Sequence, residues 1–119
     1  MLIVFEDQLD LLKDRYVTLE LDTIKFGTDG VPKTAYCVVE NINLDNIIRL
    51  NELKRTHSNL IESYRNQSWE TCLEAIESLT GQWNGELDSF YQDLAERVNN
   101  YKTNPPTSPW DPVIIKKHA

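Results

Sequence analysis

A helical repeat of hydrophobic positions runs through residues 87–101. Hydrophobic side chains recur there at steps of three, one, three, one, three and three residues, with polar residues between them. This spacing predicts an α-helix with one apolar stripe. A single helix cannot bury such a stripe, so other elements must cover it. The stripe consists of Leu87, Phe90, Tyr91, Leu94, Ala95, Val98 and Tyr101.

Two further helices are predicted before this one. The first begins after Asn43, a suitable N-cap, has Asp45 in its first turn and ends near Arg65. The second is capped by Ser68 and stopped by Gly81. The expected buried faces are Ile47, Leu50, Leu53, His57, Leu60, Ile61 and Tyr64 in the first helix, and Trp69, Cys72, Leu73, Ile76 and Leu79 in the second.

The N-terminal third has a different period. Residues 16–24 alternate hydrophobic and polar, which predicts a half-buried strand. Turn-forming residues fill 26–33, and 34–39 reads as a second strand, so the two form a β-hairpin. An isolated hairpin is marginal in water. Residues 2–5 fit either a third strand or a helix start, and 6–15 favours a short helix.

The expected fold is therefore one α+β domain. An N-terminal β-hairpin, preceded by the short helix (1–42), packs on an antiparallel array of about three helices (43–101). The tail, 102–119, holds four prolines that forbid further helix, so it should be extended, with Trp110 as an anchor.

Charge and cysteine content narrow the class of protein. The 119 residues include 19 acidic and 12 basic ones, for a net charge of −7, and no long basic run, which argues against nucleic-acid binding. An acidic surface favours solubility or a basic protein partner. Cys37 and Cys72 lie among apolar residues, as free thiols of a cytoplasmic protein do. Residues 1–5 are too short an apolar run for a signal peptide or membrane span.

No residue set carries a catalytic, cofactor or metal signature. His57 lies on an apolar stripe and is expected to be structural, and Cys72 is expected to be an inert core thiol. Acidic residues at helical spacing can bind a cation, but they more often form a solvated face. These are the sets Glu70/Glu74, Glu74/Glu77 and Glu86/Asp88/Asp93.

The tryptophans are the best candidates for protein contact. Trp83 lies between two helices and Trp110 lies in the tail, both off the helical stripes, and exposed Trp is enriched at interfaces. Two structural alternatives stand beside this hypothesis. Trp110 would fold back onto the helix pair, with Asp111 bonding a helix-end amide or pairing with Arg97, and Trp83 would cap its loop. The candidate protein-binding residues are Trp83, Tyr91, Arg97, Trp110 and Asp111.

The segment 64–76 resembles the turn and second helix of a tetratricopeptide repeat, with Tyr64 and Ala75 at the matching positions, although their separation differs by about two residues. The segment 64–111 is similar to the C-terminal tail of many bacterial class III adenylate cyclases. Pro112 stands where those tails often carry Gly, and the catalytic domain is absent, so no cyclase activity is implied. The matching residues are Trp69, Ala75, Tyr91, Arg97, Pro105, Pro106, Trp110 and Asp111.

The whole layout also resembles small proteins encoded by tailed phages. We therefore expect a non-enzymatic protein–protein interaction module in the bacterial host cytoplasm that binds a host or phage protein, and no cofactor. One alternative is a structural component of a virion or a homo-oligomer joined through the hairpin edge. Another is a regulator that binds a small ligand between hairpin and helices.

Overall fold

The computed structural model describes residues 2–12, 16–27, 30–39, 47–106 and 110–116. The fold is α+β, as the sequence predicts. Two compact units make up the chain: a sheet unit from residues 1–40 and 111–119, and a helical unit from residues 41–110. Each unit is described by itself.

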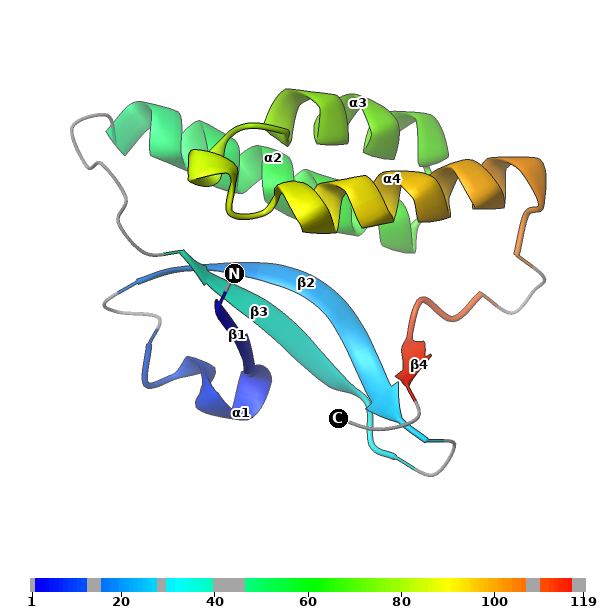
Figure 1. Cartoon of the computed structure of the whole chain (residues 1–119), viewed down its shortest axis with the longest axis horizontal. Helices are drawn as coiled ribbons and strands as arrows, with labels where there is room; N and C mark the ends of the chain where they lie inside the picture. Colours follow the sequence, from blue (N-terminus) through cyan, green and yellow to red (C-terminus); the bar gives the residue numbers. More distant parts are fainter. Residues whose placement is uncertain (1, 13–15, 28–29, 40–46, 107–109, 117–119) are drawn as a thin grey trace. The chain divides into compact units, whose positions relative to one another are not determined.

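The sheet unit contains four strands in the order β1-β3-β2-β4 (Figure 1). The predicted hairpin is β2 (Val17–Phe26) and β3 (Lys33–Val39), paired antiparallel. Residues Leu2–Phe5 form β1, antiparallel to β3, so the strand alternative for this segment is confirmed. The short β4 (Ile114–Lys116), which the sequence pattern did not predict, runs parallel to the end of β2.

A β-bulge in β2 explains how its hydrophobic pattern changes phase. Leu19 and Leu21 are buried, whereas the next hydrophobic residue, Ile24, follows after three positions instead of two. The pairing with β3 shifts register between Glu20 and Thr23. The extra residue in the bulged strand returns the hydrophobic side chains beyond it to the same face of the sheet as those before it. The strand therefore continues to Phe26, beyond the predicted end at residue 24.

The short N-terminal helix, α1, is shorter than the sequence predicts. It spans only Glu6–Leu9 (α1), where a helix over 6–15 was expected, and Leu11 beyond it is 81% exposed. A segment of this length gains little from helical hydrogen bonds alone, so it ends where its packing on the sheet ends.

The hairpin turn depends on a glycine, because a Cβ at Gly30 would lie 2.3 Å from the carbonyl oxygen of Phe26.

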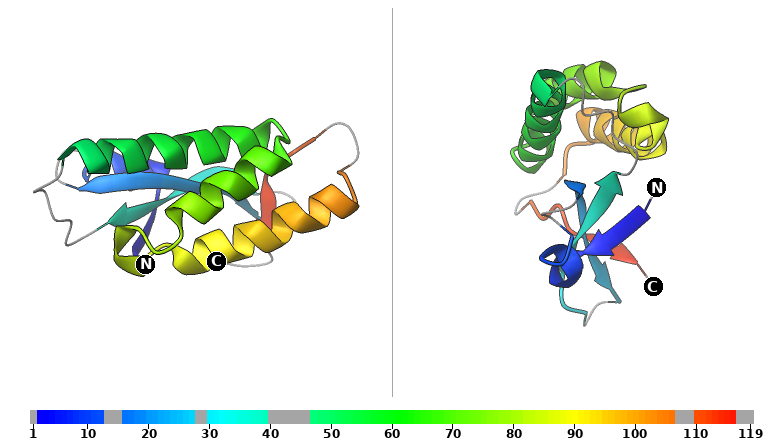
Figure 2. Two further views of the ribbon diagram at one scale, coloured as in Figure 1. Left: turned by 90° about the horizontal axis from the view of Figure 1, so that it is seen from above. Right: turned by 90° about the vertical axis from the view of Figure 1, so that its left-hand side faces the viewer.

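The helical unit consists of α2 (Ile47–Arg65), α3 (Trp69–Leu79) and α4 (Asp88–Thr103), each of which runs roughly antiparallel to the one before it (Figure 1). The short α3 packs against both long helices, which lie on either side of it in the end-on view of Figure 2. Twelve residues of the predicted stripes are buried in this core. Its buried members are His57, Leu60, Ile61, Tyr64, Cys72, Ile76, Leu79, Leu87, Phe90, Tyr91, Leu94 and Val98.

The predicted helix ends hold for α3 and for the end of α2. Ser68 occupies the N-cap of α3, although its side chain makes no capping hydrogen bond, and Gly81 follows the helix with φ +85°. The N–H of Gly81 donates to Asp88 Oδ1 at 2.8 Å, which ties the end of α3 to the start of α4. The predicted cap at Asn43 and Asp45 lies outside the described residues.

Candidate functional site

Two of the predicted contact residues are buried, which corrects the sequence prediction for them. Trp83 is 6% exposed and Tyr91 is fully buried, so neither can contact a partner in this conformation. Trp83 caps the α3–α4 loop from the 3₁₀ turn η1 (Trp83–Gly85), where its φ is +54°. Within the described residues, its indole N–H and Glu86 Oε2 find no hydrogen-bond partner. Burial of the indole ring must offset the cost of the left-handed backbone at Trp83 and the cost of its buried N–H without a partner.

Trp110 belongs to an aromatic cluster that closes one end of the helical unit. Its ring meets those of Tyr64, Trp69 and Tyr101 edge-on, with centroids 5.7, 5.7 and 5.3 Å away. Its indole N–H donates to the carbonyl oxygen of Arg65, the last residue of α2, at 2.8 Å. This carbonyl is one that a helix end leaves without an internal partner. Trp110 therefore pins the tail to the helix pair, as the structural alternative predicts.

The other two predicted contact residues, Arg97 and Asp111, lie in different surroundings. Arg97 Nη1 donates to the hydroxyl of Tyr64 at 3.4 Å, and Nη2 pairs with Asp93 Oδ2 at 2.8 Å. Its guanidinium also lies over the Tyr64 ring. Asp111 is exposed, and its Oδ1 accepts a hydrogen bond from the Val113 N–H before β4. The five predicted contact residues therefore do not form one surface.

His57 is part of the core, as the sequence predicts. His57 is 1% exposed, and its Nδ1 lies 2.9 Å from the hydroxyl of Tyr91. The bond joins α2 to α4, and the imidazole ring also contacts Phe90. A buried hydrogen bond between two core rings fixes how the helices align.

Cys72 is a buried thiol whose surroundings suppress its reactivity. It is fully buried at the α2–α3 contact, and its Sγ lies 3.9 Å from the carbonyl oxygen of Leu60. Desolvation raises the pKa of this thiol from 9.0 to about 11. Because the thiolate is the reactive form, the site suits packing and not nucleophilic chemistry.

We expect Cys72 to resist thiol reagents in the folded protein. At mildly alkaline pH its thiolate fraction should be about a hundredfold below that of the unfolded chain, because burial raises the pKa from 9.0 to about 11. Because folding raises this pKa, the buried thiol contributes its full stabilisation of the folded state below pH 9. This stabilisation is lost as the pH rises through 11. Labelling a Cys37→Ala variant, folded and in guanidinium chloride, measures the ratio. Equal rates in both states would contradict burial.

The acidic sets do not form a metal site. Glu70, Glu74 and Glu77 are exposed on α3, and Glu70 forms an ion pair with Lys102 of α4. Among the described residues, no three His, Cys, Asp or Glu side chains come together as metal ligands would. In the same part of the chain, no helix is long and apolar enough to cross a bilayer.

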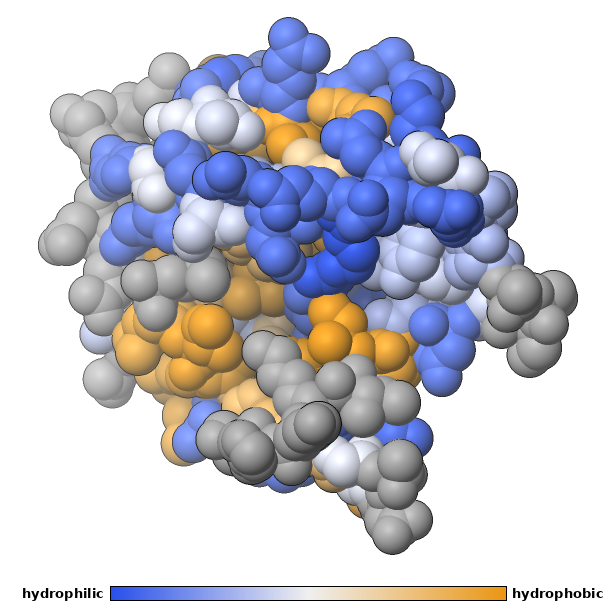
Figure 3. Space-filling view, turned by 45° about the vertical axis from the view of Figure 1, so that its right-hand side comes forward, coloured by the Kyte–Doolittle hydropathy of each residue, from blue (hydrophilic) through white to orange (hydrophobic). Residues whose placement is uncertain are grey.

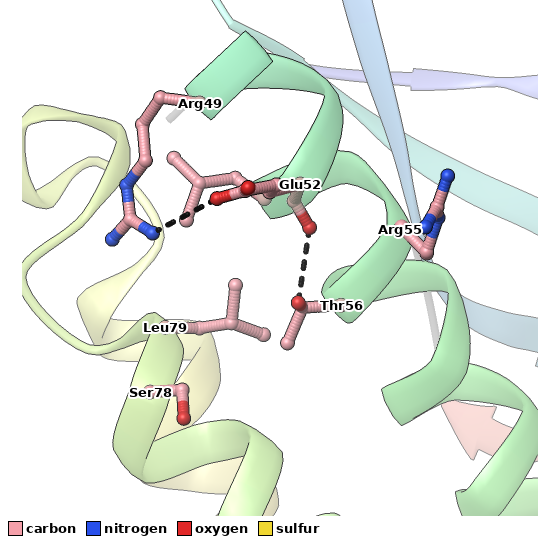
Figure 4. Close-up of a pocket in the computed structure, with 7 residues that line it drawn as sticks. Arg49, Glu52, Arg55, Thr56, Ser78 and Leu79 are labelled. Carbon is pink, nitrogen blue, oxygen red and sulfur yellow. Dashed lines mark hydrogen bonds and ion pairs between the residues drawn. The ribbon is translucent and has the colours of Figure 1, made fainter.

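A hollow of about 520 Å³ lies between α2 and α3, but its polar groups do not converge (Figure 4). Arg49 pairs with Glu52 at 3.6 Å on one side, and Arg55 extends away from them. Ligand sites usually aim several polar groups at one point, so the hollow specifies no ligand. Its lining consists of Arg49, Glu52, Leu53, Arg55, Thr56, Ser78 and Leu79.

The face of the helical unit seen in Figure 3 offers little hydrophobic surface, whereas one edge of the sheet exposes two apolar side chains. The upper part of Figure 3, where the helices lie, is mostly hydrophilic with a small hydrophobic area. At the sheet edge, β1 exposes Leu2 by 50% and Ile3 by 47%. No described strand pairs with the outer side of β1. The Phe5 N–H at its end already donates to Gln8 Oε1 at 3.4 Å, so the backbone edge that a further strand could use lies toward Leu2 and Ile3.

Sequence reasoning identified β1 only as a possible strand and did not recognise it as a contact surface. The signal was present, because residues 2–5 are four apolar residues without a charge or proline. Natural edge strands usually carry such a protective residue. However, a run of this kind also fits a central strand, and only the strand order places it at the edge.

The comparisons with known proteins assign no function to this chain. No protein-family model, no curated protein sequence and no solved structure matches this chain. The exposed edge of β1 is therefore taken as the candidate functional site on its geometry alone.

Proposed function

We propose that this chain is a non-enzymatic protein–protein interaction module that binds its partner along the outer edge of β1. The observation that carries the proposal is this unpaired edge with its exposed side chains, Leu2 and Ile3. An extended segment can add to such an edge through main-chain hydrogen bonds, while alternate side chains provide specificity. The proposal places the protein in a bacterial cytoplasm, including one infected by a phage.

The chemistry of the other candidate groups supports a binding role over an enzymatic one. His57 is held inside the core by Tyr91, and burial raises the pKa of the Cys72 thiol to about 11, which suppresses its reactive thiolate form. Both groups are therefore used for packing. The two free cysteines, both buried, fit a reducing compartment.

The test combines partner capture with an edge variant. Wild-type protein would capture its partner from a bacterial lysate, and the purified partner would be titrated against wild type and against Ile3→Lys. A lysine on an edge strand discourages further pairing. We expect at least a tenfold loss of affinity, because the variant removes an apolar contact and adds a charge at the interface.

Val31→Lys is the matched control. Val31 is 77% exposed in the β2–β3 turn of the same unit, so it receives the same change away from β1. Its affinity should equal that of wild type. A partner that binds Ile3→Lys as tightly as wild type, or the absence of any stoichiometric partner, would contradict the proposal.

The same observation favours a second candidate function, self-assembly. Two copies of β1 can pair antiparallel about a twofold axis, since a strand edge is complementary to itself. The chain would then be a structural component, such as a virion protein or a homo-oligomer. Light scattering over a range of concentrations separates the two functions, because self-assembly requires a dimer that Ile3→Lys dissociates.

A further inference from the structure

The turn that follows the exposed edge is acidic. Glu6 and Asp7 begin α1 directly after β1, both are exposed, and Asp10 follows the helix. Residues 2–12 contain these three carboxylates and no basic residue. Lys33 of β3 pairs with Asp7 at 3.7 Å in an exposed contact that solvent screens. The edge therefore passes from an apolar half at Leu2 and Ile3 to an acidic end.

We propose that β1 receives an extended peptide segment that is apolar at one end and carries lysine or arginine at the other. This inference deepens the proposed function and rests on it. The apolar side chains would cover Leu2 and Ile3, and the basic ones would lie beside Glu6 and Asp7. Complementary charge fixes register and discriminates among partners more than it adds affinity.

The direction of the segment follows from the same geometry. Antiparallel pairing is the more common arrangement between strands. A segment antiparallel to β1 meets the Phe5 end of the strand with its own N-terminal residues. The basic residues should therefore precede the apolar ones in the partner's sequence.

The experiment uses fluorescence anisotropy with labelled peptides and the whole chain. One probe is Lys-Lys-Thr-Val-Val-Val-Thr, whose adjacent valines face both sides of the strand as Leu2 and Ile3 do. Other probes replace both lysines by glutamine or by glutamate, or move them to the C-terminal end. We expect the N-terminal lysine probe to bind most tightly. The double variant Glu6→Gln, Asp7→Asn should weaken that probe about fivefold and leave the glutamine probe unchanged.

Glu74→Gln together with Glu77→Gln is the matched control. It removes the same net charge from exposed positions on α3 of the helical unit and should change each affinity less than twofold. Equal binding of the lysine, glutamine and glutamate probes would overturn the inference about charge and leave the edge as a binding site. Tighter binding of the C-terminal lysine probe would overturn the antiparallel direction.

Two further outcomes would reach the proposed function itself. If no probe binds and the protein is a dimer that Ile3→Lys dissociates, a second copy occupies the edge, and the peptide inference is wrong. If no probe binds and the protein is a monomer, the edge binds no extended segment of this kind. A partner that still binds Ile3→Lys would then overturn the proposed contact site as well.

Discussion

Leu94→Asp should unfold the helical unit or bring it close to unfolding. Leu94 is 1% exposed on the buried stripe of α4. An unpaired carboxylate at such a position adds the cost of a buried charge to the loss of an apolar contact, and we expect a loss above about 4 kcal/mol. A small domain has only about 5–15 kcal/mol in total. Urea denaturation followed by far-ultraviolet circular dichroism reports on this unit, because it contains nearly all of the described helix.

Two variants calibrate this measurement. Leu94→Ala should cost about 2–5 kcal/mol, since it removes packing without adding a charge. Glu96→Ala changes an exposed residue of the same helix and should stay within about 0.5 kcal/mol of wild type. If Leu94→Asp melts at the wild-type temperature, the stripe faces water and the architecture of the helical unit is wrong.

Trp110→Ala should destabilise the helical unit by about 2–3 kcal/mol. The substitution removes three edge-on ring contacts and the hydrogen bond to the Arg65 carbonyl oxygen. This loss is smaller than that for a fully buried tryptophan, because Trp110 is only half-buried. Thermal unfolding and urea denaturation both measure the loss.

Trp110→Phe separates packing from hydrogen bonding. Phenylalanine keeps a ring in the cluster but cannot donate to Arg65, so we expect a loss of about 1 kcal/mol. An alanine variant as stable as wild type would show that the tail does not rest on the helix pair in solution.

The helices were predictable from the sequence because their information is local. The stripe of 87–101 describes a face of α4 that the structure buries, and Gly81 marks the end of α3. A helix satisfies its backbone within one segment, so periodicity and end residues suffice to find it. The Trp110 anchor was also foreseen as a structural alternative, because prolines in the tail exclude further helix.

The candidate site was less predictable because exposure depends on tertiary packing. Trp83 lies off every helical stripe, and yet a left-handed turn at Trp83 and Asn84 accompanies its burial. Tyr91 was expected on the buried stripe and was also taken as a contact residue through a family resemblance, and only the first role agrees with its burial. Leu2 and Ile3 were not considered as contact residues at all.

The sequence by itself determined the three long helices, the hairpin strands, and which thiols and imidazole belong to the core. Only the tertiary structure decided that residues 2–5 form an edge strand, that β4 joins the sheet in parallel, and that Trp110 closes the aromatic cluster. The physical reason is the range of the interactions. Helical hydrogen bonds and turn preferences act between near neighbours in the chain, whereas strand order and exposure depend on which distant segments meet.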